Sequence, residues 1–384
     1  MDTKVISGQP SWTFASDKVE AAVTQLGGQL GPVTFTLPDG RKISPYSVAP
    51  WAEENLPETM PAILRALRGD FFCAPFGGND SPFGDEQHPA HGEVANEPWK
   101  FETLTSLNIG KSRVMLHLSL ATRVREGRVD KYIQLREGES AVYSQHVLSK
   151  ASGPMNLGHH AMLKFPETEG SGRISTSALL YGQVAPQTFE EPEKGGYSSL
   201  KTGATFTSLE SVPAADGGTV DLTRYPARGG FEDLVMFVHE STPDFAWLAV
   251  AFPEQGYVWY TLKDPRTLRS TVFWISNGGR HYEPWSKRHK LVMGLEDVTS
   301  YFHYGLAESA RNNEVNALGY PTALVLDSDT PLTINYIQGV TAIPADFDKV
   351  ASIEQDTDGQ ITLVSANGIR VTTPVDTSFL YKTG

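Results

Sequence analysis

The stretch DLVMFVHESTPDFAWLAVAFPEQGYVWYTLKDPRTLRSTVFWIS, residues 233–276, decides the fold class. It contains four apolar runs rich in β-branched and aromatic residues, at 233–240, 245–252, 257–262 and 270–276. Short polar segments with Pro, Gly and Asp separate these runs. Strands joined by turns have this pattern, so the stretch predicts consecutive β-strands.

The same pattern continues along most of the chain. Further strands are expected at 32–37, 114–121, 132–136, 142–149, 155–165, 174–180 and 291–298. Helical spacing predicts only short helices, at 16–26, 59–67 and 301–311. Because strands do not alternate with long helices, a doubly wound parallel sheet is disfavoured. We therefore expect an all-β protein, a large antiparallel β-sandwich of two twisted sheets with a few short helices.

The sequence contains no convincing linker, so we expect residues 1–384 to form a single domain. Residues 322–384 are expected as terminal hairpins added to the sandwich. Two long polar segments, 75–98 and 183–201, interrupt the strands. Loops of this length within a compact domain are usually functional or mobile.

Composition narrows the classes of function. The net charge of -13 disfavours binding to nucleic acid or to an anionic membrane surface, because both need clustered Lys and Arg. The single cysteine, Cys73, excludes an internal disulfide. The N-terminal residues lack the basic start and apolar stretch of a signal peptide. The default expectations are a cytoplasmic protein, monomer or homodimer, with a small molecule as its partner.

The most specific segment is LRGDFFCAPFG at 67–77 followed by HPAHGEVANEPW at 88–99. With Arg68 and His91 at its centre, it resembles the front half of aldose 1-epimerases, in the galactose mutarotase-like superfamily. The nearest branch is the one that contains glucose-6-phosphate 1-epimerase. The resemblance covers roughly residues 30–310 and implies that Arg68 and His91 bind a sugar substrate.

A second segment, Asn156-Leu-Gly-His-His160, resembles the family strand whose histidine is the general acid, which places that acid at His160. Strand geometry agrees independently. Neighbouring side chains on a strand point to opposite faces, so only one of His159 and His160 can face a given cleft. Leu157, His159 and Leu163 share an apolar face, which leaves His160 on the face better suited to a site.

A third segment, Leu291 to Val298, is similar to the family strand that carries the catalytic glutamate, here Glu296. Gly294 lies on the same face of this strand and removes bulk beside Glu296, where a ligand could approach. A weaker match places Asp233 at a family position that binds sugar hydroxyls.

These residue types suit the interconversion of α and β anomers of a hexose or hexose phosphate. A base takes a proton from the anomeric hydroxyl while an acid gives one to the ring oxygen, and the ring opens and recloses. By resemblance Glu296 is the base and His160 the acid, and each typically contributes about 10²–10⁴-fold. The reaction needs no cofactor. For a phosphorylated sugar a second basic group is expected, and its candidates are Arg65, Lys100, Arg280 and Lys287.

Three other uses of these residues remain open. His88, His91, His159, His160 and Glu296 are residue types that bind zinc or manganese. The same fold can also serve as a sugar-binding module in which the acid and the base are idle. A lyase or glycosidase is the third alternative, and because a glycosidase needs two carboxylates, Asp233 and Asp297 are its candidates for the second one.

Overall fold

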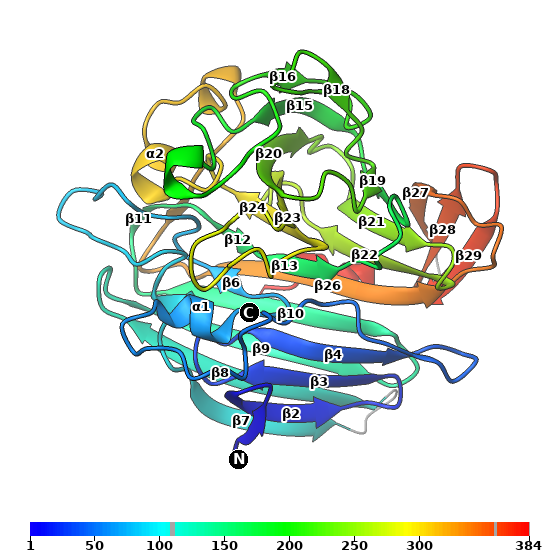
Figure 1. Cartoon of the computed structure of the whole chain (residues 1–384). Helices are drawn as coiled ribbons and strands as arrows, with labels where there is room; N and C mark the ends of the chain where they lie inside the picture. The colour runs from blue at the N-terminus through cyan, green and yellow to red at the C-terminus, as the bar shows by residue number, and fades with distance from the viewer. Residues whose placement is uncertain (108–111, 357–358, 384) are drawn as a thin grey trace.

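Two large antiparallel layers make up the molecule, in a computed structural model that describes residues 1–107, 112–356 and 359–383 (Figure 1). The first layer is a nine-stranded sheet. Its strands, in spatial order, are β19 (Arg224–Tyr225), β14 (Gly172–Thr176), β21 (Ala246–Phe252), β22 (Tyr257–Lys263), β26 (Leu332–Ala342), β10 (Ala141–Ser149), β9 (Gly127–Arg136), β8 (Arg113–Thr122) and β7 (Lys100–Leu107).

Two sheets make up the second layer. The first has five strands, β1 (Lys4–Ile6), β2 (Gln9–Ala15), β3 (Val19–Thr24), β4 (Leu30–Thr36) and β5 (Lys42–Ile43), and it lies over β7 to β9 in Figure 1. The order of the other, eight-stranded sheet is β16 (Thr205–Phe206), β15 (Leu179–Val184), β20 (Phe231–His239), β23 (Ser270–Asn277), β24 (Val292–Thr299), β12 (Leu157–His159) and β6 (Phe72–Cys73), with β13 (Ala161–Lys164) also paired to β24.

The four apolar runs at 233–276 build both layers. They form β20, β21, β22 and β23, and the middle two pair as a hairpin in the nine-stranded sheet. The outer two pair with each other in the eight-stranded sheet. One continuous stretch of sequence therefore connects the two layers, and the expected antiparallel β-sandwich is confirmed.

Shorter elements connect and cover these sheets. Two strand pairs, β11 (Gly153–Met155) with β25 (Leu324–Leu326) and β17 (Val212–Pro213) with β18 (Thr219–Val220), lie outside them. A separate three-stranded sheet contains β27 (Val350–Gln355), β28 (Gln360–Ser365) and β29 (Arg370–Pro374). The helices of the described residues are α1 (Ala62–Ala66), α2 (Leu306–Ala310) and the 3-10 turns η1 (Glu93–Ala95), η2 (Pro192–Lys194), η3 (Asn316–Leu318) and η4 (Thr377–Tyr381).

The expected helix at 16–26 is wrong, because this segment holds strand β3, paired with β2 and β4. Val19, Ala21 and Val23 are buried and alternate along the strand, a second pattern in the same residues that the helical interpretation overlooked. The helices expected at 59–67 and 301–311 exist but are shorter, as α1 and α2. Residues 322–384, expected as terminal hairpins, contribute β25 to the pair with β11, β26 to the middle of the nine-stranded sheet, and β27 to β29 to a separate sheet.

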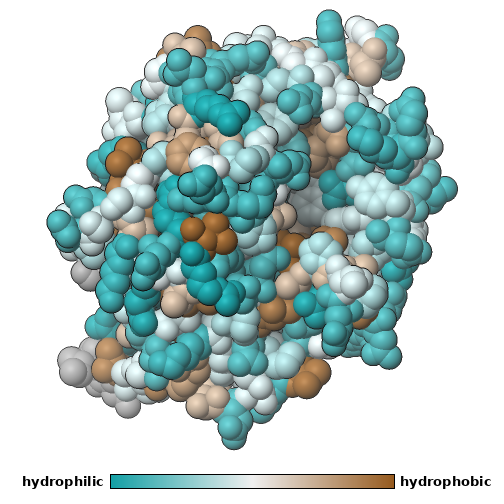
Figure 2. All heavy atoms as spheres, turned by 90° about the vertical axis from the view of Figure 1, so that its left-hand side faces the viewer, coloured by the Kyte–Doolittle hydropathy of each residue, from teal (hydrophilic) through white to brown (hydrophobic). Residues whose placement is uncertain are grey.

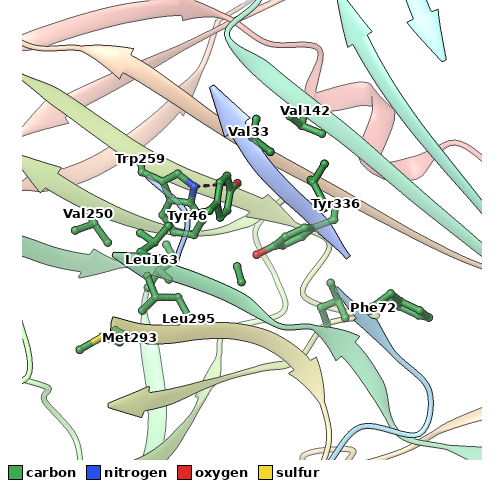
Figure 3. Close-up of a cluster of buried hydrophobic side chains, with 14 of the residues drawn as sticks. Val33, Tyr46, Phe72, Val142, Leu163, Val250, Trp259, Met293, Leu295 and Tyr336 are labelled. Carbon is green, nitrogen blue, oxygen red and sulfur yellow. Dashed lines mark hydrogen bonds between the residues drawn. The ribbon is translucent and has the colours of Figure 1, made fainter. Parts of the chain in front are cut away.

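The main core fills the space between the layers, where Val33, Phe72, Val142, Leu163 and Leu295 are all buried (Figure 3). A second apolar cluster lies on the opposite face of the eight-stranded sheet and includes Met162, Leu234 and Trp274. The eight-stranded sheet is thus covered on both faces. Neighbouring residues of one strand enter different environments, and this alternation positions the candidate site.

Candidate active site

A pocket on the face of the eight-stranded sheet that turns away from the main core collects side chains from distant segments. It encloses about 230 Å³. Its walls come from the segment around α1, from both long loops (through His91 and Phe189), and from strands β20, β23 and β24. The polar residues that line it are His91, His160, Arg280, Glu296 and His303.

His160 and Glu296 meet in this pocket. His160 lies between β12 and β13, and its backbone N–H donates to the carbonyl of Phe71 at 2.9 Å. Its Nε2 lies 3.2 Å from Oε1 of Glu296, within ion-pair distance but without the alignment of a hydrogen bond. Within the described residues, neither Glu296 Oε1 nor His160 Nδ1 has a hydrogen-bond partner. Buried polar groups are usually bonded, so these atoms mark a place where polar groups of a ligand could bind.

Burial changes the protonation of this pair. It raises the pKa of Glu296 well above its ordinary value and lowers the pKa of His160 well below its own. Both shifts favour the uncharged forms of the side chains. Burial therefore favours a pair with no net charge that holds one transferable carboxyl proton.

Two glycines make this meeting sterically possible. A Cβ at Gly158 would lie 2.5 Å from the carbonyl oxygen of Asp297, so only glycine lets β12 approach β24 this closely. A Cβ at Gly294 would lie 2.4 Å from Glu296 Oε1, which agrees with the expectation that Gly294 leaves room beside Glu296.

His91 comes from the first long loop, with its backbone in the left-handed region at φ 59°. Its N–H donates to the carbonyl of Gly77 at 2.6 Å. Its Nδ1 accepts from the N–H of Gly77 at 3.4 Å and lies 3.3 Å from the thiol of Cys73. A backbone N–H can only donate, so Nδ1 carries no proton and His91 holds its proton on Nε2. Burial lowers the pKa of His91 to about 4, which keeps the ring neutral.

Aromatic rings fix both imidazoles. Phe71 stacks on His160 at 4.5 Å between ring centroids, and Trp274 meets the same ring edge-on at 5.8 Å. The centroids of His91 and His160 are 5.1 Å apart. Rings held from several sides lose little freedom when a substrate binds, so the donors are already placed.

Sequence reasoning did not place Arg280, His303 or Phe189 at the site. The guanidinium of Arg280 lies over Trp285 at 4.5 Å, and its Nε donates to Glu190 at 2.5 Å. His303 is half-buried and, among the described residues, its buried Nδ1 lacks a hydrogen-bond partner. Arg280 was one of four candidates for a phosphate contact. His303 lay within an expected helix, and its sequence context gave no signal of a site.

The structure does not bring two expected substrate-binding residues to the pocket. Arg68 is fully buried and donates to the backbone carbonyls of Ile6 and Ser7, both at 2.8 Å. Asp233 points to the other face of β20, where its oxygens accept from the backbone of Ser199 and Leu200 at 2.8 Å. The polar atoms of both side chains are therefore used within the protein.

Directly behind the site, the same strands carry a second set of buried polar groups. His159 Nδ1 lies 2.8 Å from Asp70 Oδ2, in hydrogen-bond contact. Asp297 accepts hydrogen bonds from Lys263 at 2.5 Å and Tyr336 at 2.7 Å, and also from Thr261 and Thr271. These groups lie behind the pocket, and the Asp297 carboxylate is balanced by the Lys263 ammonium.

Metal and membrane features were also assessed. Among the described residues, no group of three or more His, Cys, Asp or Glu side chains is arranged to hold a metal ion. In the same part of the chain, no helix combines the length and apolar character needed to span a membrane.

Comparison with family models gives no match, and neither does comparison with curated proteins. Solved structures do match. A candidate aldose 1-epimerase of Klebsiella pneumoniae has a TM-score of 0.59 at 14% identity, covering 88% of this chain and 80% of that one. A galactose mutarotase-like protein of Clostridium acetobutylicum has 0.57 at 12%, covering 89% and 99%. A candidate aldose 1-epimerase of Escherichia coli K12 has 0.57 at 12%, covering 88% and 100%. At these identities the likeness establishes the fold, a β-sandwich of the galactose mutarotase-like type.

Proposed function

We propose that this protein interconverts the α and β anomers of a hexose or hexose phosphate, as an aldose 1-epimerase does. The observation that carries the proposal is the contact of His160 and Glu296 in a pocket, with buried polar atoms that lack partners among the described residues. The fold shared with aldose 1-epimerase-like structures supports it. The resemblance of the sequence motifs assigns the roles, with Glu296 as the base and His160 as the acid.

The proton balance of the reaction fits the electrostatics of this pair. Ring opening removes one proton from the anomeric hydroxyl and adds one to the ring oxygen, so the enzyme gains and loses one proton in each step. A pair that is neutral overall holds the one transferable proton that this exchange needs. The reaction proceeds from the form of the pair in which the carboxyl proton has moved to His160 Nε2, 3.2 Å away. The Glu296 carboxylate then takes the hydroxyl proton, the His160 imidazolium gives its own to the ring oxygen, and ring closure reverses both transfers.

His91 supports the same chemistry. Because its Nδ1 accepts from Gly77, its Nε2–H is available as a donor. A neutral donor beside the reacting oxygens stabilises negative charge that develops during ring opening. We assign substrate binding to His91. Arg68 and Asp233 receive a structural role instead, since their polar atoms bind backbone groups of the protein.

A glycosidase reaction has less support. Glu296 is the one carboxylate among the described residues that line the pocket, and a glycosidase usually places two carboxylates beside its substrate. Asp297, the neighbour of Glu296, points into the main core and is bonded there.

Polarimetry tests the proposed function. Freshly dissolved α-glucose and α-galactose, and their 6-phosphates, should reach anomeric equilibrium faster with the wild-type protein than with buffer. Glu296→Gln should abolish that acceleration, whereas Glu254→Gln, an exposed change in the turn between β21 and β22, should leave it intact. A wild-type rate equal to that of buffer for all these sugars would contradict the proposal.

A further inference from the structure

The pocket lining contains two chemically different sets of side chains. His91, His160 and Glu296 present polar atoms. The segment around α1 presents Ile63, Leu64 and Leu67, which are apolar. Figure 2, which looks at the side of the molecule that is on the left in Figure 1, shows apolar side chains beside a hollow. A ligand that fills the pocket therefore meets both hydrogen-bonding groups and hydrocarbon.

The apolar wall extends beyond α1. The ring of Trp51 meets that of Trp285 edge-on at 4.9 Å, and its Nε1 donates to the carbonyl of Leu64 at 2.7 Å. Trp51 thus joins the α1 segment to Trp285, which also lines the pocket. These contacts hold Leu64 and Trp285 in place as two apolar residues of the pocket lining.

The backbone of this wall is already bonded within the protein. The N–H of Ile63 donates to Asn96 at 3.1 Å, and its carbonyl accepts from Gln29 at 3.4 Å. The carbonyl of Leu64 is taken by Trp51. Sugar hydroxyls placed against this wall would lose their water without gaining partners, which disfavours their binding. An alkyl or aryl group placed there would instead gain from burial.

The charges around the pocket do not favour a phosphate. Arg280, the cation of the lining, donates to Glu190 and lies over aromatic rings. Glu232 also lies near it, bonded to Trp274 at 3.0 Å, and both carboxylates raise the pKa of Arg280 against the opposing effect of burial. Its charge is therefore balanced inside the protein. An added phosphate would have to compete with these carboxylates.

We infer that the substrate is an aldose that carries an apolar substituent, alkyl or aryl, at the end remote from its anomeric carbon. This inference rests on the proposed function, because it places the anomeric carbon at Glu296 and His160. The substituent then lies against Leu64 and Trp285. Hexoses with a hydroxyl or a phosphate at that end are poorer substrates.

A substrate series tests the inference on the wild-type protein. Catalysed mutarotation is measured for D-glucose, 6-deoxy-D-glucose, 6-O-benzyl-D-glucose and D-glucose 6-phosphate. We expect kcat/KM for the deoxy sugar to exceed that for glucose about tenfold, with the benzyl sugar at least as good and the phosphate the poorest. If glucose or its phosphate is as good as the deoxy sugar, the inference is overturned while the proposed function stands.

Two variants test whether the preference for the deoxy sugar depends on Leu64. Leu64 is only partly buried, so Leu64→Asn can fold, and it should remove most of the preference for the deoxy sugar. Leu180→Asn replaces an exposed leucine outside the pocket and should keep the preference. An unchanged preference in a folded Leu64→Asn protein would place the substituent elsewhere and overturn the inference.

Binding separates failure of the inference from failure of the proposed function. Trp274 and Trp285 line the pocket, so tryptophan fluorescence reports occupancy without catalysis. If none of the sugars is accelerated, the proposed function is lost. Tighter binding of 6-O-benzyl-D-glucose than of D-glucose would then still support the apolar subsite, and equal binding would overturn it.

Discussion

The two faces of the eight-stranded sheet treat neighbouring residues in opposite ways. On β24, Asp297 points into the main core and accepts four hydrogen bonds, including one from Lys263. Glu296 points into the pocket, where within the described residues its Oε1 has no hydrogen-bond partner. His159 and His160 repeat part of this contrast one strand away. His159 Nδ1 bonds to Asp70, although within the described residues its Nε2 has no partner. His160 Nε2 lies 3.2 Å from Glu296 without the alignment of a hydrogen bond.

This difference separates an ionisable group that stabilises the fold, Asp297, from one that is available for catalysis, Glu296. A buried ion that is surrounded by donors stabilises one arrangement of the chain and has little freedom to react. A buried acid without partners destabilises the folded state slightly and keeps its proton available. Catalytic activity should therefore depend on the residues of the pocket face, and stability on the polar residues of the core face.

The largest expected effect is a difference in kcat between substitutions of the neighbouring histidines His159 and His160. His160→Gln removes the proposed acid and should lower kcat about 10²–10⁴-fold, while His159→Gln should lower it less than tenfold. The measurement is mutarotation by polarimetry, with circular dichroism to confirm that both variants fold. Equal losses of kcat in two folded variants would remove the distinction between the faces.

The next effect concerns stability. Asp297→Asn leaves the Lys263 ammonium buried without its counter-ion and should lower the free energy of unfolding by about 3–5 kcal/mol. Glu296→Gln replaces a buried carboxyl group, the proposed base, whose ionisation burial disfavours, and should not destabilise the protein. Urea unfolding of both variants and the wild type gives the comparison. A Glu296→Gln protein as unstable as Asp297→Asn would mean that Glu296 is a structural group.

The pH dependence of stability should have opposite signs at these two positions. Burial raises the pKa of Glu296, so its contribution is complete below the ordinary value of 4.5 and is lost as pH rises through the folded pKa. Burial alone would raise the pKa of Asp297, but Lys263 outweighs it and lowers that pKa, so its contribution is present above 3.8 and is lost as pH falls through the folded pKa.

Unfolding measurements across pH test these signs. The stability of Glu296→Gln relative to wild type should increase as pH rises above 4.5, by at most about 1.4 kcal/mol per pH unit. The penalty of Asp297→Asn should be full near neutral pH and shrink below 3.8. Parallel pH curves for the two variants would contradict the assigned shifts.

The smallest expected effect concerns Cys73, which lies beside His91. It refines the comparison of the two faces because Cys73 is on the pocket side of the sheet and yet has hydrogen-bond partners. Burial, with Glu296 and Asp70, raises the pKa of Cys73, so its thiol keeps its proton. The thiol can share this proton between the Phe71 carbonyl at 3.9 Å and His91 Nδ1 at 3.3 Å. Cys73→Ala should lower kcat/KM about two- to tenfold, and Cys73→Ser should restore most of it. Nitrogen chemical shifts of the His91 ring should show a less uniform Nε2–H tautomer in Cys73→Ala alone. Unchanged shifts would contradict this positioning role.

Alternation along strands made much of the site predictable. It placed His160 and Glu296 on faces suited to a cleft and put Gly294 beside Glu296, and the structure shows the resulting contact. The fold class followed from the apolar runs at 233–276. The fold class needed only the local period of a strand, whereas the choice of Glu296 and His160 also needed the resemblance to a known family.

What the sequence could not predict depends on contacts between distant segments. The direction of Arg68 is set by carbonyls of Ile6 and Ser7, far away in the chain. Arg280 reaches the pocket because the second long loop supplies Glu190. Neither contact produces a periodic pattern in the sequence from which it could be predicted. The segment at 16–26 is a different case, because its apolar residues fit the spacing of both a helix and a strand.

The central position of β26 has a consequence for how the protein is made. Ala141 of β10 pairs with Gly339, and Tyr257 of β22 pairs with Ala342. During synthesis, therefore, β10 and β22 each have an unpaired edge until residues 332–342 leave the ribosome. Unpaired strand edges favour aggregation. Glu296 and His160 are translated before that point. A nascent chain that stalls there already carries the proposed acid and base but lacks the strand that closes the layer behind them, which supports the proposal that residues 1–384 form one folding unit.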